Sequence, residues 1–187
     1  MLGGQYGVSV ICNQVHYSLL DYGSMALRKM DLTCKELGVA ILAYSPIGQG
    51  LLADGLSTES FSSIKVARML RLEYSEIHPL RMAISRIAKS HGGKSMAQVA
   101  LNWCYAHGTV PLIGCRSLKQ ARDTLGSLGW DLSEEEVKEL DKLALGRSTL
   151  DSLGWRRALF IILASLVMLV CRGMDWLGYG MVKGAEL

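Results

Sequence analysis

The sequence predicts an α/β fold in which parallel strands are covered by helices. Three short segments rich in Val, Ile and other apolar residues lie at 7–15, 39–43 and 109–113. The stretches between them are long, and they contain the capping patterns that mark helix starts. Strands joined by such helical crossovers pair in parallel, with right-handed connections. The 187 residues, 50% hydrophobic and 20% charged, suffice for one sizeable core.

The first strand and helix are predicted in the N-terminal third of the chain. Residues 7–15 read GVSVICNQV, and the amides of Asn13 and Gln14 stand near the end of this strand. Apolar residues recur at helical spacing from Ser24 to Leu37. The glycine that follows Leu37 is a typical helix stop, so we expect the helix to end there.

The second strand leads into a turn with the composition of a ligand site. The apolar segment 39–43 is followed by Tyr44, Ser45, Gly48 and Gly50. An aromatic ring and accessible backbone amides would therefore emerge together at the carboxyl end of a strand. In α/β folds this is where ligands bind.

The middle of the chain predicts a long connection and then two helices. Residues 53–78 carry a weak pattern, which indicates a connection with one short helix. Pro79 is expected to open an amphipathic helix, since proline is favoured at the first helical position. Ser95 and Gln98 form a capping box, and the helix that they start should stop near His107.

The last predicted strand is followed by two more helices. Residues 109–113, TVPLI, form the strand, and Ser117 can cap a helix that runs to Leu125. Ser133 and Glu136 form another capping box, which starts the final helix.

Charge and cysteine content exclude several classes of protein. The net charge of +3 comes from scattered basic residues, so a nucleic-acid partner is not indicated. Five cysteines, without a CxxC pair or a Cys/His cluster, predict neither a disulfide framework nor a zinc site. The start lacks the features of a secretory signal. A reducing compartment is therefore expected, either the cytoplasm or an organelle stroma.

Four motifs together resemble the last three βα units of an aldo-keto reductase. They are NQVHYSLL at 13–20, GVAILAYSPIGQGLL at 38–52, SMAQVALNW at 95–103 and VPLIGCRSLKQARDTLGSL at 110–128. They occur in the family's order. The resemblance implies that residues 1–147 are the C-terminal part of a (β/α)8 TIM barrel. It also implies an oxidoreductase that reduces carbonyl compounds by hydride transfer, with NADP(H) as cofactor.

The resemblance assigns seven residues to the cofactor. Gln14 would bind the nicotinamide carboxamide and Tyr44 would stack on the nicotinamide ring; Ser45, Gly48 and Leu51 would line the pyrophosphate; Arg116 and Gln120 would lie at the adenosine end. Their chemistry agrees in outline, because an amide side chain both donates and accepts, and a flat ring is held by another flat ring. A helix start beside an arginine would also suit a 2′-phosphate.

Each assignment has a structural alternative. Gln14 could be a buried, satisfied amide, and Tyr44 a half-buried strand aromatic. Gln120 could serve only as the capping partner of its own helix, and we expect that it cannot easily cap the helix and bind the cofactor at once. Arg116 could be a solvated surface charge. His16, within the first of these motifs, fits a structural hydrogen-bonding residue better than a catalyst.

The family's catalytic tyrosine, lysine, histidine and aspartate belong to the first half of the barrel. No tyrosine of this sequence matches the catalytic motif, so no catalytic residue is assigned and the chain alone is expected to be inactive. Three strands without the remainder would leave the barrel open. We expect a fragment or truncated product whose open edge is covered by the missing N-terminal half or by another protein. The alternative function is a non-enzymatic nucleotide- or partner-binding module, or a truncated pseudoenzyme.

The C-terminal tail, residues 148–187, carries no family motif. Within it, 158–171 is an uninterrupted apolar run bracketed by arginines. Runs of this length are short for a membrane span, so the pattern leaves three interpretations open. The segment is a membrane anchor or interfacial helix, a hydrophobic helix packed over the open barrel edge, or an unstructured tail.

Overall fold

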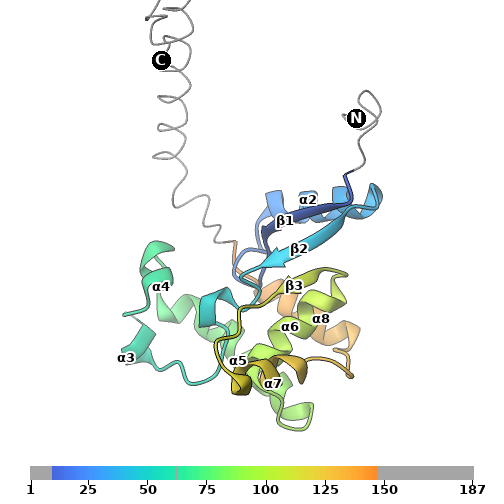
Figure 1. Cartoon of the computed structure of the whole chain (residues 1–187). Coiled ribbons are helices and arrows are strands. Elements are labelled where there is room, and N and C mark those ends of the chain that lie inside the picture. Colours follow the sequence, from blue (N-terminus) through green and yellow to red (C-terminus); the bar gives the residue numbers. More distant parts are fainter. Residues whose placement is uncertain (1–9, 62, 147–187) are drawn as a thin grey trace, which may run out of the picture. The chain divides into compact units, whose positions relative to one another are not determined.

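The computed structural model describes residues 10–61 and 63–146, which contain a three-stranded sheet. Its strands are β1 (Cys12–His16), β2 (Ala40–Tyr44) and β3 (Val110–Leu112), in that spatial order (Figure 1). Both pairs are parallel. His16 lies opposite Tyr44, and Tyr44 lies opposite Leu112, so the three strands end at the same level. The predicted α/β class with parallel strands is confirmed.

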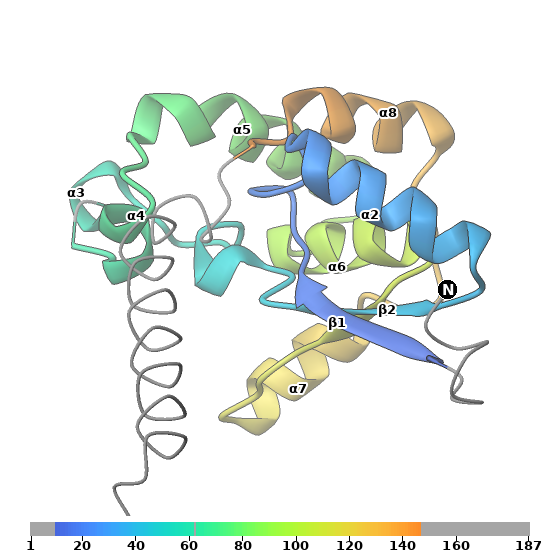
Figure 2. The same cartoon turned by 90° about the horizontal axis from the view of Figure 1, so that it is seen from above.

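The helices of the described residues fill the crossovers between the strands. They are α2 (Met25–Glu36), α3 (Thr58–Phe61), α4 (Lys65–Met69), α5 (Tyr74–Ser90), α6 (Met96–Ala106), α7 (Leu118–Leu125) and α8 (Glu134–Leu143). Helix α2 packs on β2 and α6 on β3, whereas α5 packs on α6 and α8 (Figure 2). In the described part of the chain, no helix is both long and apolar enough to cross a membrane.

Two predicted capping boxes start helices as expected. The Ser95 hydroxyl accepts from the Gln98 N–H at 3.1 Å, and the Gln98 side chain accepts from the Ser95 N–H at 3.0 Å. Ser133 and Glu136 make the same reciprocal pair, at 3.2 and 2.9 Å. Both pairs satisfy N–H groups that the first helical turn leaves free.

The predicted start of α5 was wrong. The helix begins at Tyr74, and Pro79 lies inside it rather than at its first position. The N–H of Glu73 donates to the Glu76 carboxylate at 2.8 Å, so a capping box fixes the start one turn earlier. Pro79 therefore costs only one hydrogen bond close to the helix start. The long connection before α5 also holds two short helices, not one.

The core lies between the sheet and the helices and is tied by a partly buried polar junction. Asp141 of α8 accepts from Trp103 Nε1 at 2.8 Å and from His107 Nε2 at 2.9 Å. Burial disfavours the charge of Asp141, but the hydrogen bonds from His107 and Trp103 outweigh it and lower the pKa of this carboxyl group. The junction holds α8 to α6 and to the loop that enters β3.

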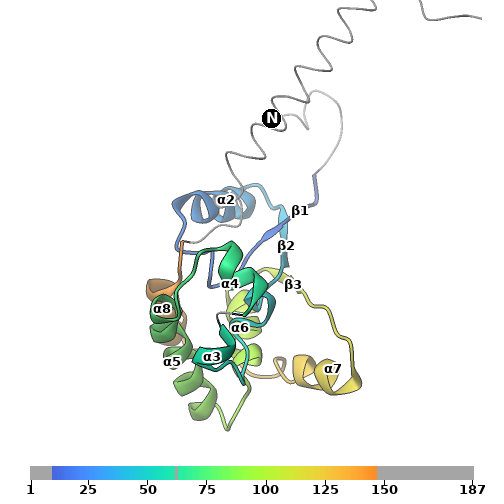
Figure 3. The ribbon, with the colours of Figure 1, turned by 90° about the vertical axis from the view of Figure 1, so that its left-hand side faces the viewer.

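The two faces of the sheet have different surroundings. Ile41 and Ala43 point to the helices and are 3% and 0% exposed. Tyr44, Val110 and Leu112 point to the opposite face and are 39%, 50% and 38% exposed. Figure 3 shows this face of the sheet without a covering layer in the described residues. Apolar side chains on both sides of a strand are typical of buried parallel sheets, so this open face is incompletely packed.

The predicted tail, residues 148–187, and its apolar segment 158–171 lie outside the described residues. The expected domain boundary near residue 147 and the expected hydrophobic helix therefore stay predictions.

Candidate functional site

The loop after β2 has an unusual backbone. Gly48 and Gly50 have φ values of +57° and +96°, and two non-glycine residues, Ser45 and Gln49, also have positive φ, at +55° and +54°. At positive φ the Cβ of an L-residue lies too close to the backbone, which is energetically unfavourable. A side chain at Gly48 would also meet Leu20, because a Cβ there would lie 2.5 Å from Leu20 Cδ1. Strained backbone of this kind is often found at functional sites.

The far end of this loop is fixed to the helices. The guanidinium of Arg81, in α5, donates from Nη1 to the carbonyl of Leu51 and to that of Ala53, the latter at 2.9 Å. Burial lowers the pKa of Arg81, although guanidinium stays charged in proteins. Asp54 accepts from the Met96 N–H at 2.9 Å, at the start of α6. The loop is thus held in place from two helices.

The loop between β3 and α7 is closed by Gln120. Its side-chain oxygen accepts from the Arg116 N–H at 2.7 Å, and its own N–H donates to the Ser117 hydroxyl at 3.2 Å. The side-chain NH₂ of Gln120 has no protein partner among the described residues. Capping and ligand binding are therefore compatible at Gln120, since the first uses the oxygen and the second can use the nitrogen.

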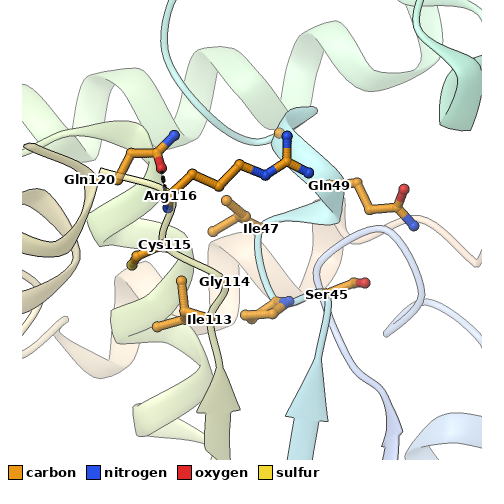
Figure 4. A pocket seen from close by; sticks show the side chains of 10 residues that line it. Ser45, Ile47, Gln49, Ile113, Gly114, Cys115, Arg116 and Gln120 are labelled. Carbon is orange, nitrogen blue, oxygen red and sulfur yellow. Dashed lines mark hydrogen bonds between the residues drawn. The ribbon is translucent and has the colours of Figure 1, made fainter. Parts of the chain in front are cut away.

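These two loops enclose a cavity of about 620 Å³ at the carboxyl ends of β2 and β3 (Figure 4). Its lining residues are Ser45, Pro46, Ile47, Gln49, Gly50, Ile113, Gly114, Cys115, Arg116 and Gln120. The Arg116 side chain extends from the β3 loop toward the β2 loop, past Ile47. Its guanidinium has no acidic partner in the described ranges. The wall therefore combines a free cation, an amide donor and bare backbone, which suits an anionic ligand.

The structure brings three of the seven predicted cofactor residues into this cavity wall: Ser45, Arg116 and Gln120. Gly48 is buried beneath it, and its N–H donates to the Ser45 carbonyl at 2.9 Å. Leu51 is fully buried, and its N–H donates to the Gly48 carbonyl at 3.1 Å. In this arrangement Gly48 and Leu51 shape the loop, and neither presents its N–H to the cavity.

Gln14 and Tyr44 lie outside the cavity wall, on the open face of the sheet. Gln14 precedes His16 by two positions, so its side chain points to the same face as that of His16 and of Tyr44. Gln14 is exposed, which disagrees with the interpretation of it as a buried amide. One amide and one aromatic ring thus lie together on neighbouring strands, beside the cavity.

Sequence reasoning missed several lining residues, including Ile47, Gln49, Ile113 and Cys115. Their only signal was their position in the two loops at the carboxyl ends of β2 and β3. No group of three or more His, Cys, Asp or Glu side chains within the described part of the chain could hold a metal ion.

Comparison with known proteins identifies what the chain is similar to. The profile of the Aldo/keto reductase family matches residues 5–145. The chain is 38% identical to the chloroplastic pyridoxal reductase of Arabidopsis thaliana over 138 residues, which are 74% of this chain and 37% of that protein. The chain covers only 37–42% of the length of three such curated relatives.

Solved structures show the same fold. The thermostable aldo-keto reductase Tm1743, in complex with the inhibitor epalrestat, matches with a TM-score of 0.56 and 25% identity, over 75% of this chain and 42% of that chain. A mutant of Gox0644 in complex with NADPH matches with a TM-score of 0.53 over 76% of this chain and 41% of that chain. At 16% identity this second likeness concerns the fold alone.

Proposed function

Because the chain belongs to the aldo/keto reductase family of oxidoreductases, we propose that it supplies the cofactor-binding part of an NADPH-dependent carbonyl reductase. The cavity between the β2 and β3 loops carries this proposal. It lies at the carboxyl ends of parallel strands, where α/β barrels bind their ligands. The ten residues that line this wall all belong to the described part of the chain.

The phosphate end of the cofactor would lie at the β3 loop. The free guanidinium of Arg116 offers a planar pair of donors that matches a phosphate group. Gly114 leaves its surroundings open, since no atom lies within 4 Å of the place where its Cβ would be. The first turn of α7 adds N–H groups and the positive end of a helix dipole. Gln120 would donate its remaining NH₂ to the adenosine.

The nicotinamide end would lie over the open face of the sheet. Tyr44 is 39% exposed, so part of its ring can stack on a flat ligand ring. Gln14, on the neighbouring strand, can both donate to and accept from a carboxamide. NADPH bound in this way would supply the hydride. The substrate would be a carbonyl compound that accepts this hydride. We choose the aldehyde pyridoxal as the test substrate, because a relative is named for its reduction.

The open face also supports a partner-binding role. Val110 and Leu112 are apolar and exposed beside Tyr44, and Leu118 and Leu125 of α7 are exposed as well. In a closed barrel such residues would be covered by the other strands and helices. We therefore propose that the remaining βα units of a barrel, or a protein that replaces them, pack here. They would also supply the proton donor, for which this sequence shows no catalytic motif, so the chain alone would bind NADPH without turnover.

The tail and the compartment complete the proposal. Residues 148–187 would form a separate segment, and the apolar run 158–171 is its candidate for a membrane contact. The barrel part would function in the cytoplasm or in an organelle stroma.

Replacement of Arg116 tests the phosphate end. Arg116→Ala should weaken NADPH binding by about 10- to 100-fold, because two charge-assisted hydrogen bonds to the 2′-phosphate are lost. NADH lacks that phosphate and should lose less than about threefold by the same reasoning. Fluorescence titration of the full chain with both nucleotides measures the two affinities.

Lys119→Ala is the matched control, because it removes an exposed positive charge from α7 outside the cavity wall. It should weaken both nucleotides only slightly. Equal losses of NADPH and NADH in Arg116→Ala would refute the assignment of the 2′-phosphate to this loop.

A further inference from the structure

A buried polar network lies at the carboxyl end of β1, next to the proposed nicotinamide site. His16 Nδ1 lies 2.6 Å from Asp21 Oδ2, and the Ser18 hydroxyl donates to the same oxygen, also at 2.6 Å. The side chains of His16 and Asp21 are only 11% and 4% exposed. None of these three residues lines the cavity, and the proposed binding contacts do not use them.

The hydrogen bonds define which nitrogen of His16 carries a proton. The Asp21 carboxylate only accepts, so Nδ1 must be the donor. Nε2 is buried and has no hydrogen-bond partner in the described residues. A buried nitrogen without a partner costs free energy, so this histidine is not explained by stability alone.

Asp21 is itself held rigidly. Its N–H donates to the Ser18 carbonyl at 3.0 Å, and its carbonyl accepts from the Ser24 N–H at 2.9 Å, just before α2. A tight turn thus fixes the carboxylate, and the carboxylate fixes the imidazole ring. His16 cannot rotate without breaking its bond to Asp21.

The ring that His16 contacts is that of Tyr44. The two ring centroids lie 5.0 Å apart and the ring planes are perpendicular. This edge-to-face geometry is favourable for aromatic pairs. The contact joins the ends of β1 and β2, where the two residues are direct neighbours in the strand register. Tyr44 is therefore held on one side while part of it stays open to solvent.

We propose that His16, oriented by Asp21, is a positioning residue that fixes the Tyr44 ring for stacking on the nicotinamide of the bound cofactor. This inference rests on the proposed function, and it assigns a role to a residue that itself touches no cofactor. The restriction of Tyr44 lowers the entropy lost when the ring stacks, which is how preorganisation increases affinity. A loose tyrosine would stack less well in the same place.

The first test needs no ligand. The tyrosine ring signals of the full chain are recorded by NMR with isotope-labelled tyrosine, and Tyr44 is assigned by the signal lost in Tyr44→Phe. In His16→Ala the Tyr44 signal should shift, because the neighbouring ring is gone. Asp21→Asn, which keeps the shape of the side chain, should shift it less. An unchanged Tyr44 signal in His16→Ala would overturn the proposal.

His91→Ala is the matched control. His91 also pairs with a carboxylate, that of Glu136 at 2.9 Å, and its ring packs on Trp130 with the centroids 4.7 Å apart. This pair joins the end of α5 to α8 and does not contact Tyr44. The substitution removes a histidine of similar surroundings, and the Tyr44 signal should stay where it is.

The second test separates positioning from general stability. His16→Ala should weaken NADPH by about three- to tenfold, the loss expected for one aromatic stacking contact. It should leave 2′,5′-ADP, which has no nicotinamide, unchanged. In a Tyr44→Ala background the same substitution should have no further effect on NADPH. Equal losses of both ligands would mean a purely structural role and would refute the proposal.

The two tests separate the two hypotheses. If the wild-type chain bound neither NADPH nor 2′,5′-ADP, the proposed function would fail, whereas the NMR signal would still decide whether His16 fixes Tyr44.

Discussion

The two faces of the sheet in this chain are built from the same strands and yet differ in completeness. In β2, Ile41 and Ala43 face the helices and are almost fully buried, whereas Leu42 and Tyr44 face the open side. Parallel strands are normally covered on both faces. The face toward the helices is therefore fully packed, and the open face is the one that would lie inside a closed barrel.

This difference also divides the proposed site. The cavity at the phosphate end is formed by two loops of this chain and is anchored by Arg81 and Gln120. The nicotinamide end, at Gln14 and Tyr44, lies over the open face. The reacting end of the cofactor would thus lie where no other described residues cover the sheet, and the non-reacting end where two loops of this chain form the cavity wall. In such an arrangement the chain could bind the cofactor without catalysing hydride transfer from it.

The same substitution on opposite faces of β2 should have the largest difference in effect. Ala43→Asp places an unpaired carboxylate among the helices and should cost about 3 kcal/mol or more in the free energy of unfolding. Ala40→Asp places it on the open face, where the residue is exposed, and should cost less than about 1 kcal/mol. Urea unfolding of the two variants measures both values.

Both variants lie in the central strand and pay the same low strand propensity of aspartate, so this term cancels. A similar loss of stability in the two variants would show that the open face is also packed, and it would contradict the comparison.

A smaller effect is expected at the junction of the helical face. Asp141→Asn removes the negative charge of the group that accepts hydrogen bonds from Trp103 and His107. The free energy of unfolding should fall by about 2 kcal/mol. The pKa of Asp141 is lowered in the folded state, so its contribution is present above about pH 4 and lost as the pH falls through the folded pKa. The free energy of unfolding, measured across acidic pH, should fall in the wild-type chain. In Asp141→Asn the part of this fall that comes from Asp141 should be missing.

Glu139→Gln provides the control on the same helix. Glu139 pairs with Arg86 on the surface, where both side chains are largely solvated, so its loss should change stability by less than about 1 kcal/mol. If the acid-dependent drop persisted unchanged in Asp141→Asn, Asp141 would not be its source.

Much of the fold could be predicted from local sequence signals. The capping boxes at Ser95 and Ser133 mark helix starts because both partners lie within four residues of each other. The parallel direction of the strands followed from the long crossovers between them. The start of α5 was missed because Pro79 is typical of a first helical position, whereas glutamate is not a preferred N-cap residue, so the box of Glu73 and Glu76 gives no clear signal in the sequence.

The site was less predictable, because its decisive contacts are not local. The burial of Leu51 depends on how its loop folds back onto the helices, which no motif records. That the side-chain nitrogen of Gln120 stays available while its oxygen accepts from the Arg116 N–H could be learned only from the folded loop. The pairing of His16 with Asp21 depends on a tight turn, and its contact with Tyr44 depends on the strand register. These are properties of the assembled sheet.

The most direct test of the account is a titration of the full chain with NADPH in the presence of pyridoxal. In the proposed site the phosphate end lies in this chain, and no tyrosine of the sequence matches the family's catalytic motif. We therefore predict saturable NADPH binding, seen by fluorescence, with no consumption of NADPH. Steady oxidation of NADPH by the purified chain, or the absence of any saturable binding, would contradict the account.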